Sequence, residues 1–220
     1  MTDENLSEDN PGTALFPQFE TDLYRMITTE VEGLTEGQLD FQSERWEWSK
    51  WSIRRNLSHM ASGDFRWFLI RWGRQLFPDG LPEVGDPEIL SSPKYDRRLD
   101  EDQYWDVDDI KGKLRDGLAM CWSILSRETV GSLRSKELEV EGGGPWANYP
   151  LLYPSALRRD PNDASLVYVT LEATFQHRYY EHITHLYNIQ RLKRAQGLEA
   201  SVEVPFEGYW ALPDWDRSEP

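Results

Sequence analysis

The fold prediction starts from residues 171–197, which read LEATFQHRYYEHITHLYNIQRLKRAQG. Mostly apolar side chains lie there on one stripe, at spacings of three, four or seven residues, namely Leu171, Phe175, His182, Leu186 and Ile189. This spacing is typical of an amphipathic helix. Basic residues lie near its end, and Gly197 can serve as its C-cap. We therefore expect one long helix that begins near Pro161 or Ala164 and ends at Gln196.

Three earlier stretches have the same periodicity and predict helices at residues 16–34, 49–77 and 106–128. Ser49 or Ser52 can cap the second of these helices, and Asp106 can cap the third. The connections 79–103 and 132–163 are rich in proline and lack periodicity, so we expect them to be long loops. A loop as long as the second is more often functional than idle.

Four amphipathic helices joined through two long connections predict an all-α four-helix bundle with two crossover connections, spanning residues 14–197. Residues 1–13 are polar and acidic, and we expect a disordered tail there. Residues 198–220 are expected to form a C-terminal extension, a short strand or a strap laid over the bundle.

The composition excludes several classes of protein. The 220 residues include 24 Lys and Arg against 39 Asp and Glu, for a net charge of −15. Such a chain repels phosphate backbones and anionic lipid, so neither nucleic acid nor a membrane is an expected partner. No signal peptide or bilayer-spanning stretch is evident, and we expect a cytoplasmic protein. The lone Cys121 excludes a multi-cysteine zinc site and is expected to be a small buried residue.

The histidines carry most of the functional information. His177, Glu181 and His185 are spaced by four residues, so they project from neighbouring turns of one helix face. Glu181 and His185 can clasp one divalent ion, and His59 on the second expected helix is the candidate third ligand. Two imidazoles and a carboxylate leave coordination positions open to water or substrate. The alternative is an ordinary exposed helix face, on which a Glu–His pair arises by chance.

A resemblance adds to this interpretation. Residues 51–60, WSIRRNLSHM, resemble the signature of the DinB-like superfamily: Trp, Ser or Thr, an aliphatic residue, two polar residues, and Leu-x-His-aliphatic. Residues 185–189, HLYNI, with Gly197 beyond, resemble the closing segment of that family. The resemblance implies a four-helix bundle in which three side chains hold a divalent metal. By position those ligands are His59, Glu181 and His185.

The commonest DinB-like pattern has a histidine at the position of Glu181. Glutamate followed four residues later by histidine is instead similar to the mycothiol-dependent maleylpyruvate isomerase branch, whose Arg-x-x-Glu-x-x-x-His-x-x-Asp-Leu pattern resembles residues 178–189. This resemblance implies a metal-dependent transferase or isomerase in which a low-molecular-weight thiol or water is activated for attack on a small-molecule substrate. Zinc is the default metal, and nickel, manganese or iron also suit the ligands.

Other functions stay open. The same ligand set suits a metal-dependent hydrolase, a non-haem iron oxygenase, or a non-catalytic bundle that sequesters a metal or ligand. A helical interaction module that forms a homodimer through tryptophan-rich segments is a further alternative.

Several other residues are weaker candidates for contacts around the metal. Asp64 is either a hydrogen-bonding partner near the site or a solvated carboxylate. His182 is expected in the core or behind the ligands, and His177 either lines the cleft or is solvated. Arg178 either orients the glutamate, binds an anionic substrate or lies on the surface. Aromatic and basic residues of the second connection form either a lid or irregular packing; these are Trp146, Tyr149, Tyr153, Arg158 and Arg159.

Overall fold

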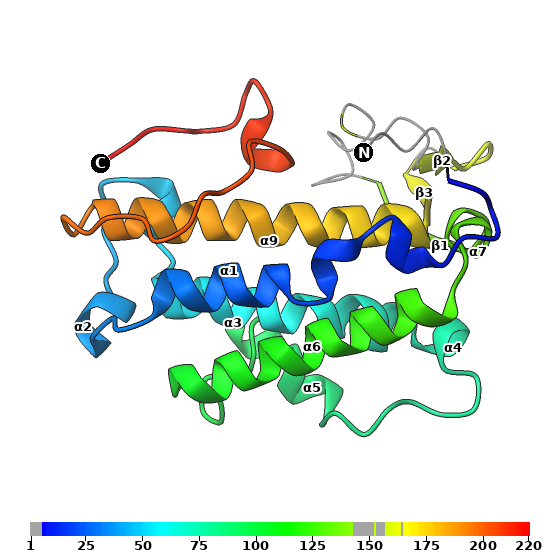
Figure 1. Ribbon diagram of the computed structural model, residues 1–220, viewed down its shortest axis with the longest axis horizontal. Helices are drawn as coiled ribbons and strands as arrows, with labels where there is room; N and C mark the ends of the chain where they lie inside the picture. Colours follow the sequence, from blue (N-terminus) through cyan, green and yellow to red (C-terminus); the bar gives the residue numbers. More distant parts are fainter. Residues whose placement is uncertain (1–5, 143–151, 153–156, 164) are drawn as a thin grey trace. The chain divides into compact units, whose positions relative to one another are not determined.

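The computed structural model describes residues 6–142, 152, 157–163 and 165–220 of the chain (Figure 1). The chain divides into two compact units. The first unit comprises residues 1–17 and 122–178, and the second comprises residues 18–121 and 179–220. Two long helices run through the division, α6 (Val107–Arg127) and α9 (Leu171–Arg194).

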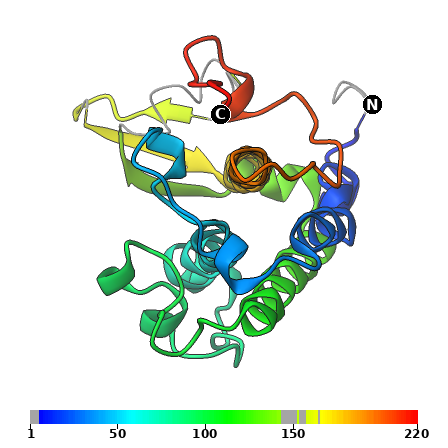
Figure 2. The same cartoon turned by 90° about the vertical axis from the view of Figure 1, so that its left-hand side faces the viewer.

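The second unit is helical. Besides its parts of α6 and α9 it contains α1 (Asp22–Val31), α2 (Glu36–Leu39), α3 (Ile53–Asp64), α4 (Gly73–Leu76) and α5 (Pro87–Leu90). A π-helix, Phe65–Arg71, continues α3, and short 3-10 helices occur at Glu47–Ser49, Pro93–Tyr95 and Tyr209–Ala211. Figures 1 and 2 show α1 and α3 running alongside α9 within this unit, with α6 on the far side of α1 and α3. Its buried core includes Phe19, Leu23, Ile27, Leu57, Phe65, Leu114, Ile183, Leu186 and Ile189.

Side-chain caps explain where two of these helices begin. The hydroxyl of Ser52 accepts a hydrogen bond from the backbone N–H of Arg55 at 3.2 Å, so α3 begins at Ile53. The carboxylate of Asp106 accepts from the N–H of Asp108 at 2.8 Å, as the sequence predicts for α6. The expected helix at residues 49–77 is thus shorter at its start, and at Phe65 its backbone changes to π-helical geometry.

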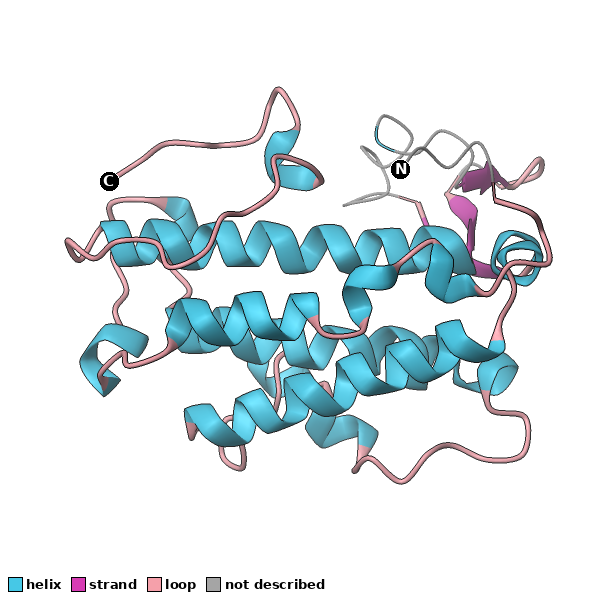
Figure 3. Cartoon of the chain, in the orientation of Figure 1, coloured by secondary structure: helices cyan, strands magenta, loops and turns pink. Residues whose placement is uncertain are grey.

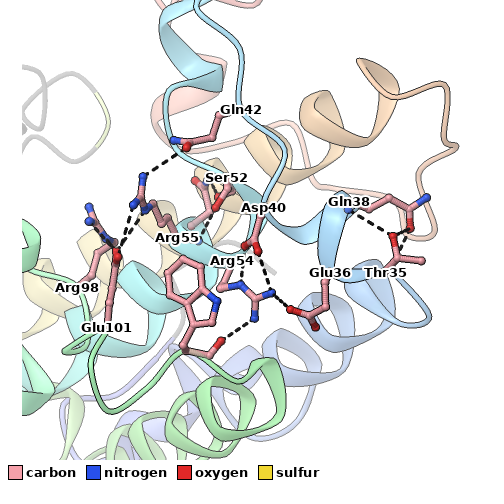
Figure 4. Close-up of polar contacts among 12 residues, drawn as sticks. Thr35, Glu36, Gln38, Asp40, Gln42, Ser52, Arg54, Arg55, Arg98 and Glu101 are labelled. Carbon is pink, nitrogen blue, oxygen red and sulfur yellow. Dashed lines mark hydrogen bonds and ion pairs between the residues drawn. The ribbon is translucent and has the colours of Figure 1, made fainter.

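A buried arginine ties the start of α3 to its surroundings (Figure 4). Arg54 donates hydrogen bonds to Asp40 at 2.6 Å and to the carbonyl of Trp105 at 2.6 Å, and it also pairs with Glu36. Its side chain is only 1% exposed, so a buried guanidinium holds both α2 and the segment before α6 against α3. The helix that carries His59 is therefore anchored on two sides.

The first unit contains a sheet (magenta in Figure 3). Strand β3 (Leu166–Thr170) lies between β1 (Glu137–Glu141) and β2 (Leu157–Arg159), and both pairings are antiparallel. Tyr168 lies opposite Glu139 on one side and Arg158 on the other. A short helix, α7 (Val130–Ser135), precedes β1.

The prediction of an all-α four-helix bundle is therefore wrong. Residues 132–163, predicted to be a loop, contribute two strands, and α9 begins at Leu171 because the five residues before it form β3. Val167 and Val169 of β3 are buried and alternate with partly exposed neighbours, which is the period of a strand. Residues 79–103 also contain a short helix, α5, inside an otherwise irregular connection.

The structure describes only some of the residues that we considered as a lid. Trp146, Tyr149 and Tyr153 lie outside the described residues. Arg158 pairs with Glu137 at 2.6 Å, and its guanidinium carbon lies 4.0 Å from the ring centroid of Tyr168. Arg158 is thus engaged on the surface of the sheet.

The N-terminal segment makes backbone contacts within the first unit. Gly12 N–H donates to the carbonyl of Glu128 at 2.8 Å, and Val130 N–H donates to the carbonyl of Asn10 at 2.8 Å. A side chain at Gly12 would meet Leu133 at 2.8 Å, so glycine allows this close approach. Residues 10–12, which we expect in a mobile tail, are therefore bound to the segment that begins α7.

Residues 198–220 follow α9 and contain no strand. The backbone N–H of Ser201 donates to the buried carboxylate of Glu30, which also pairs with Lys193 at 2.5 Å. Farther along, Trp210 stacks on Tyr187 with ring centroids 4.3 Å apart, and Tyr187 donates to Glu219 at 2.8 Å. The extension therefore forms a strap within the second unit. No helix of the described chain is long and apolar enough to span a bilayer.

Candidate metal centre

The structure brings the three predicted ligands together inside the second unit. His59 Nε2 lies 3.6 Å from Glu181 Oε2, and His185 Nε2 lies 3.6 Å from the same oxygen. One ligand atom from each residue lies within 4.8 Å of the others. Ligands about 2.1 Å from a tetrahedral ion stand about 3.4 Å from one another. The cluster therefore needs only small side-chain adjustments to surround one ion.

Helix geometry places two of the ligands side by side, and helix packing brings the third one to them. Glu181 and His185 are one turn apart on α9, so helix formation alone puts them on one face. His59 lies in α3, and it reaches the cluster only because α3 packs against α9 in this unit. The imidazole rings of His59 and His185 have centroids 4.8 Å apart.

Asn56 determines which nitrogen of His185 faces the cluster. The Asn56 amide nitrogen donates to the carbonyls of Ser52 at 2.9 Å and Trp51 at 3.2 Å. Carbonyls only accept, so these bonds fix the orientation of the amide and leave its oxygen facing His185 Nδ1 at 2.7 Å. Nδ1 must then carry a proton, so in the neutral ring the lone pair lies on Nε2. A partner that holds the remote nitrogen in this way is common behind metal-bound histidines.

His59 is neutral for a different reason. His59 as a whole is 4% exposed, and its Nδ1 has no hydrogen-bond partner among the described residues. Burial lowers the pKa of His59 from 6.5 to about 3; the Glu181 carboxylate opposes this shift, and the charges of His185 and Arg66 add to it. At neutral pH the ring is unprotonated, which is the form that binds metals.

Trp51 forms an aromatic wall beside both histidines. Its ring centroid lies 5.0 Å from that of His59 and 6.1 Å from that of His185, and it is nearly parallel to the second ring, at 12°. The guanidinium of Arg98 lies 5.1 Å from the Trp51 centroid. Glu101 pairs with both Arg98 and Arg55, at 2.8 Å and 3.2 Å (Figure 4). Charged residues of the connection 79–103 thus support the wall.

Sequence reasoning assigned no role at the metal to Trp51 or Asn56. Both lie inside the decapeptide 51–60, and Asn56 precedes His59 by one turn. The one-turn spacing places Asn56 near His59. The hydrogen-bond partner of the Asn56 side-chain oxygen is His185, however, and no spacing within the decapeptide indicates a contact with that other helix.

Asp64 and His182 form a second polar pair in this unit. His182 Nε2 lies 3.1 Å from each carboxylate oxygen of Asp64, and both side chains are fully buried. Asp64 is therefore not a solvated carboxylate, and His182 lies in the core with its ring edge against Phe19. Neither residue belongs to the three-ligand cluster. Their pair links α3 to α9 one residue from Glu181.

His177 and Arg178 lie on the part of α9 that belongs to the first unit. His177 is 3% exposed, so it is not solvated, and Arg178 is fully buried, so it is not a surface arginine. Cys121 is buried, as the sequence predicts.

The cluster is partly open to solvent. The side chains of Glu181 and His185 are 18% and 14% exposed, whereas that of His59 is 5% exposed. With both imidazoles unprotonated, as metal binding requires, the two rings and the carboxylate carry a charge of about −1, which a divalent ion would reverse. The arrangement can hold such an ion and leave room for a small ligand. Comparison of the chain with protein-family models, curated proteins and solved structures finds no match.

Proposed function

We propose that this protein binds one divalent metal ion through His59, Glu181 and His185 and acts as a metal-dependent transferase or isomerase. The observation that carries the proposal is the meeting of these three ligand atoms within 4.8 Å. The oriented lone pair of His185 and the neutral ring of His59 also support it. The resemblance of residues 51–60 and 178–189 to the DinB-like superfamily, in its maleylpyruvate isomerase branch, supports the same ligand set.

A divalent ion in an open site of this kind lowers the pKa of a bound water or thiol and polarises a carbonyl. The residues of the chain hold and shape the site. Glu181 supplies the negative charge, Asn56 keeps the His185 ring in one tautomer, and Trp51 shields one side from water. We propose zinc as the metal, with nickel, manganese or iron as alternatives, and a low-molecular-weight thiol or water as the group activated.

A second candidate function is metal sequestration without turnover. The 5% exposure of His59 favours it, because an ion held partly by a buried ligand would exchange slowly with solvent. A hydrolase is the variant of the first proposal in which water is the activated group.

Metal analysis tests the ligand set. The purified protein is stripped with a chelator, reloaded with zinc or cobalt(II), and desalted before the metal is counted. We expect one equivalent in the wild type, its loss in His59→Ala, Glu181→Gln and His185→Ala, and its retention in His182→Gln. Full metal in folded His59→Ala would overturn the proposed site.

The cobalt form then tests whether a thiol is the activated group. If a thiol can reach the metal, addition of 2-mercaptoethanol should shift the visible spectrum and add a sulfur-to-metal absorption band. An unchanged spectrum at saturating thiol would exclude the thiol-activating function and leave sequestration or hydrolysis.

A further inference from the structure

A pocket of about 430 Å³ lies in the second unit, where the π-helix meets α4 and the turn that follows it. Its apolar walls include Leu69, Ile70, Phe77, Leu81 and Pro87. Sites for small molecules have volumes of about 300–1,000 Å³ and mostly apolar walls with a few polar groups. We call this space the π-helix pocket; it contains none of the three metal ligands.

The pocket gathers apolar side chains that solvent can reach. Ile70 and Leu81 are 47% and 50% exposed, and the described residues contain only two other large hydrophobic side chains that are exposed, Trp105 and Phe206. Single exposed apolar residues are ordinary, whereas exposed apolar residues gathered in one concave site are a feature of ligand-binding grooves.

The backbone explains how this surface arises. Trp72 N–H donates to the carbonyl of Trp67 at 2.9 Å, five residues back, which is the wide π-helical turn. A side chain at Gly73 would approach Leu81 to 2.8 Å, so the missing side chain lets Leu81 lie against the helix. Short π-helical segments are frequent at functional sites.

Arg74 supplies the polar group of the pocket. Its side chain is exposed and makes no hydrogen bond, ion pair or ring contact with any described residue. Among the described lysines and arginines only Arg115 and Arg159 share this property, although the chain has 39 acidic residues to pair with. A guanidinium beside an apolar wall is the complement of a carboxylate attached to an apolar group.

We propose that the π-helix pocket binds a small amphipathic anion. Its acyl chain or ring would lie among Ile70, Phe77 and Leu81, and its carboxylate would pair with Arg74. The site requires no metal and is independent of the function proposed for the histidine cluster.

Calorimetric titration of the full-length protein with decanoate, below its micelle concentration, tests the site. We expect one decanoate per chain and about tenfold weaker binding to Arg74→Gln, because one charge-assisted contact is lost. The matched control is Arg115→Gln, which removes the same charge from another exposed, unpaired arginine and should bind as the wild type does. Decanol, which lacks the carboxylate, should bind equally to the wild type and Arg74→Gln.

Leu81→Ser tests the apolar wall and should weaken decanoate and decanol alike, with an unchanged thermal midpoint to show that it folds. Equal losses in Arg74→Gln and Arg115→Gln would overturn the proposal, because they would reflect net charge alone. Absence of saturable decanoate binding would overturn it as well. So would concentration-dependent self-association of the wild type that Leu81→Ser abolishes, because the surface would then be an interface between copies.

Discussion

Asn56 Oδ1 lies 2.7 Å from His185 Nδ1 and links the second turn of the metal-site helix α3 to a metal ligand on α9. The asparagine amide is itself held by two carbonyls at the start of α3. The cap of one helix and the tautomer of a histidine on another are therefore parts of one hydrogen-bond network.

Replacing Asn56 should weaken the metal site. In Asn56→Leu, His185 loses the acceptor for its Nδ1 proton, and we expect metal affinity to fall about 10- to 100-fold. Asn56→Asp keeps an oxygen that can accept from His185 and loses only the amide N–H donors to the two carbonyls. Metal affinity should therefore fall less in this variant than in Asn56→Leu, although the free energy of unfolding also decreases. Competition with a chromophoric chelator measures the affinities, and the ranking fails if both variants bind metal equally.

The buried Asp64–His182 pair should contribute to stability rather than to metal binding. His182→Gln shortens the side chain and leaves a buried carboxylate poorly satisfied, and we expect the free energy of unfolding to fall by about 1–3 kcal/mol. Urea unfolding measures the loss, and metal analysis should show one equivalent retained. Loss of metal at unchanged stability would instead make His182 part of the metal site.

Two glycines of α6 should respond in opposite ways to alanine. A Cβ at Gly117 would lie 3.2 Å from the Cβ of Asp64, whose carboxylate is already paired and buried, so Gly117→Ala should destabilise the fold by about 1–2 kcal/mol. Gly112 is the matched control, because a Cβ there meets nothing within 4 Å. Gly112→Ala should stabilise the protein by about 0.5–1 kcal/mol through helix propensity. Thermal unfolding of both variants measures the difference, and equal effects would contradict the close packing at Asp64.

The metal-free protein should lose stability in weak acid because of His59. Burial holds the pKa of this histidine near 3, whereas in the unfolded chain it is near 6.5. Above pH 6.5 both states are neutral and the group has no effect on stability. Between pH 6.5 and 3 the unfolded state binds the proton and the folded state does not. Stability should therefore fall by up to about 1.4 kcal/mol per pH unit as the pH decreases.

Urea unfolding of the chelated protein at several values between pH 4.5 and 7.5 measures this slope. His59→Leu is the comparison variant, because it packs without a titratable group and should show a shallower slope over that range. Parallel slopes in the two proteins would mean that His59 is protonated in the folded state.

Local sequence patterns predicted the structure correctly where all the residues that form the pattern lie in one helix. The 3.6-residue period placed helices at the cores of α1, α3, α6 and α9, and the Asp106 cap is a contact between near neighbours. The sheet was missed because β3 is only five residues long and directly precedes α9, so its apolar residues read as the first turn of that helix. Its partner β1 lies in a distant segment, and long-range pairing leaves little trace in local periodicity.

At the candidate site, sequence alone determined that Glu181 and His185 share a face, since an i, i+4 pair is adjacent on any α-helix. It also singled out His59 through the decapeptide around it. Tertiary structure decided the rest: how α9 is rotated against α3 determines that His185 meets Asn56, that Trp51 covers both rings, and that His182 points to Asp64. A helix's own period fixes the relative directions of its side chains, but only packing against its neighbours sets which direction faces inward.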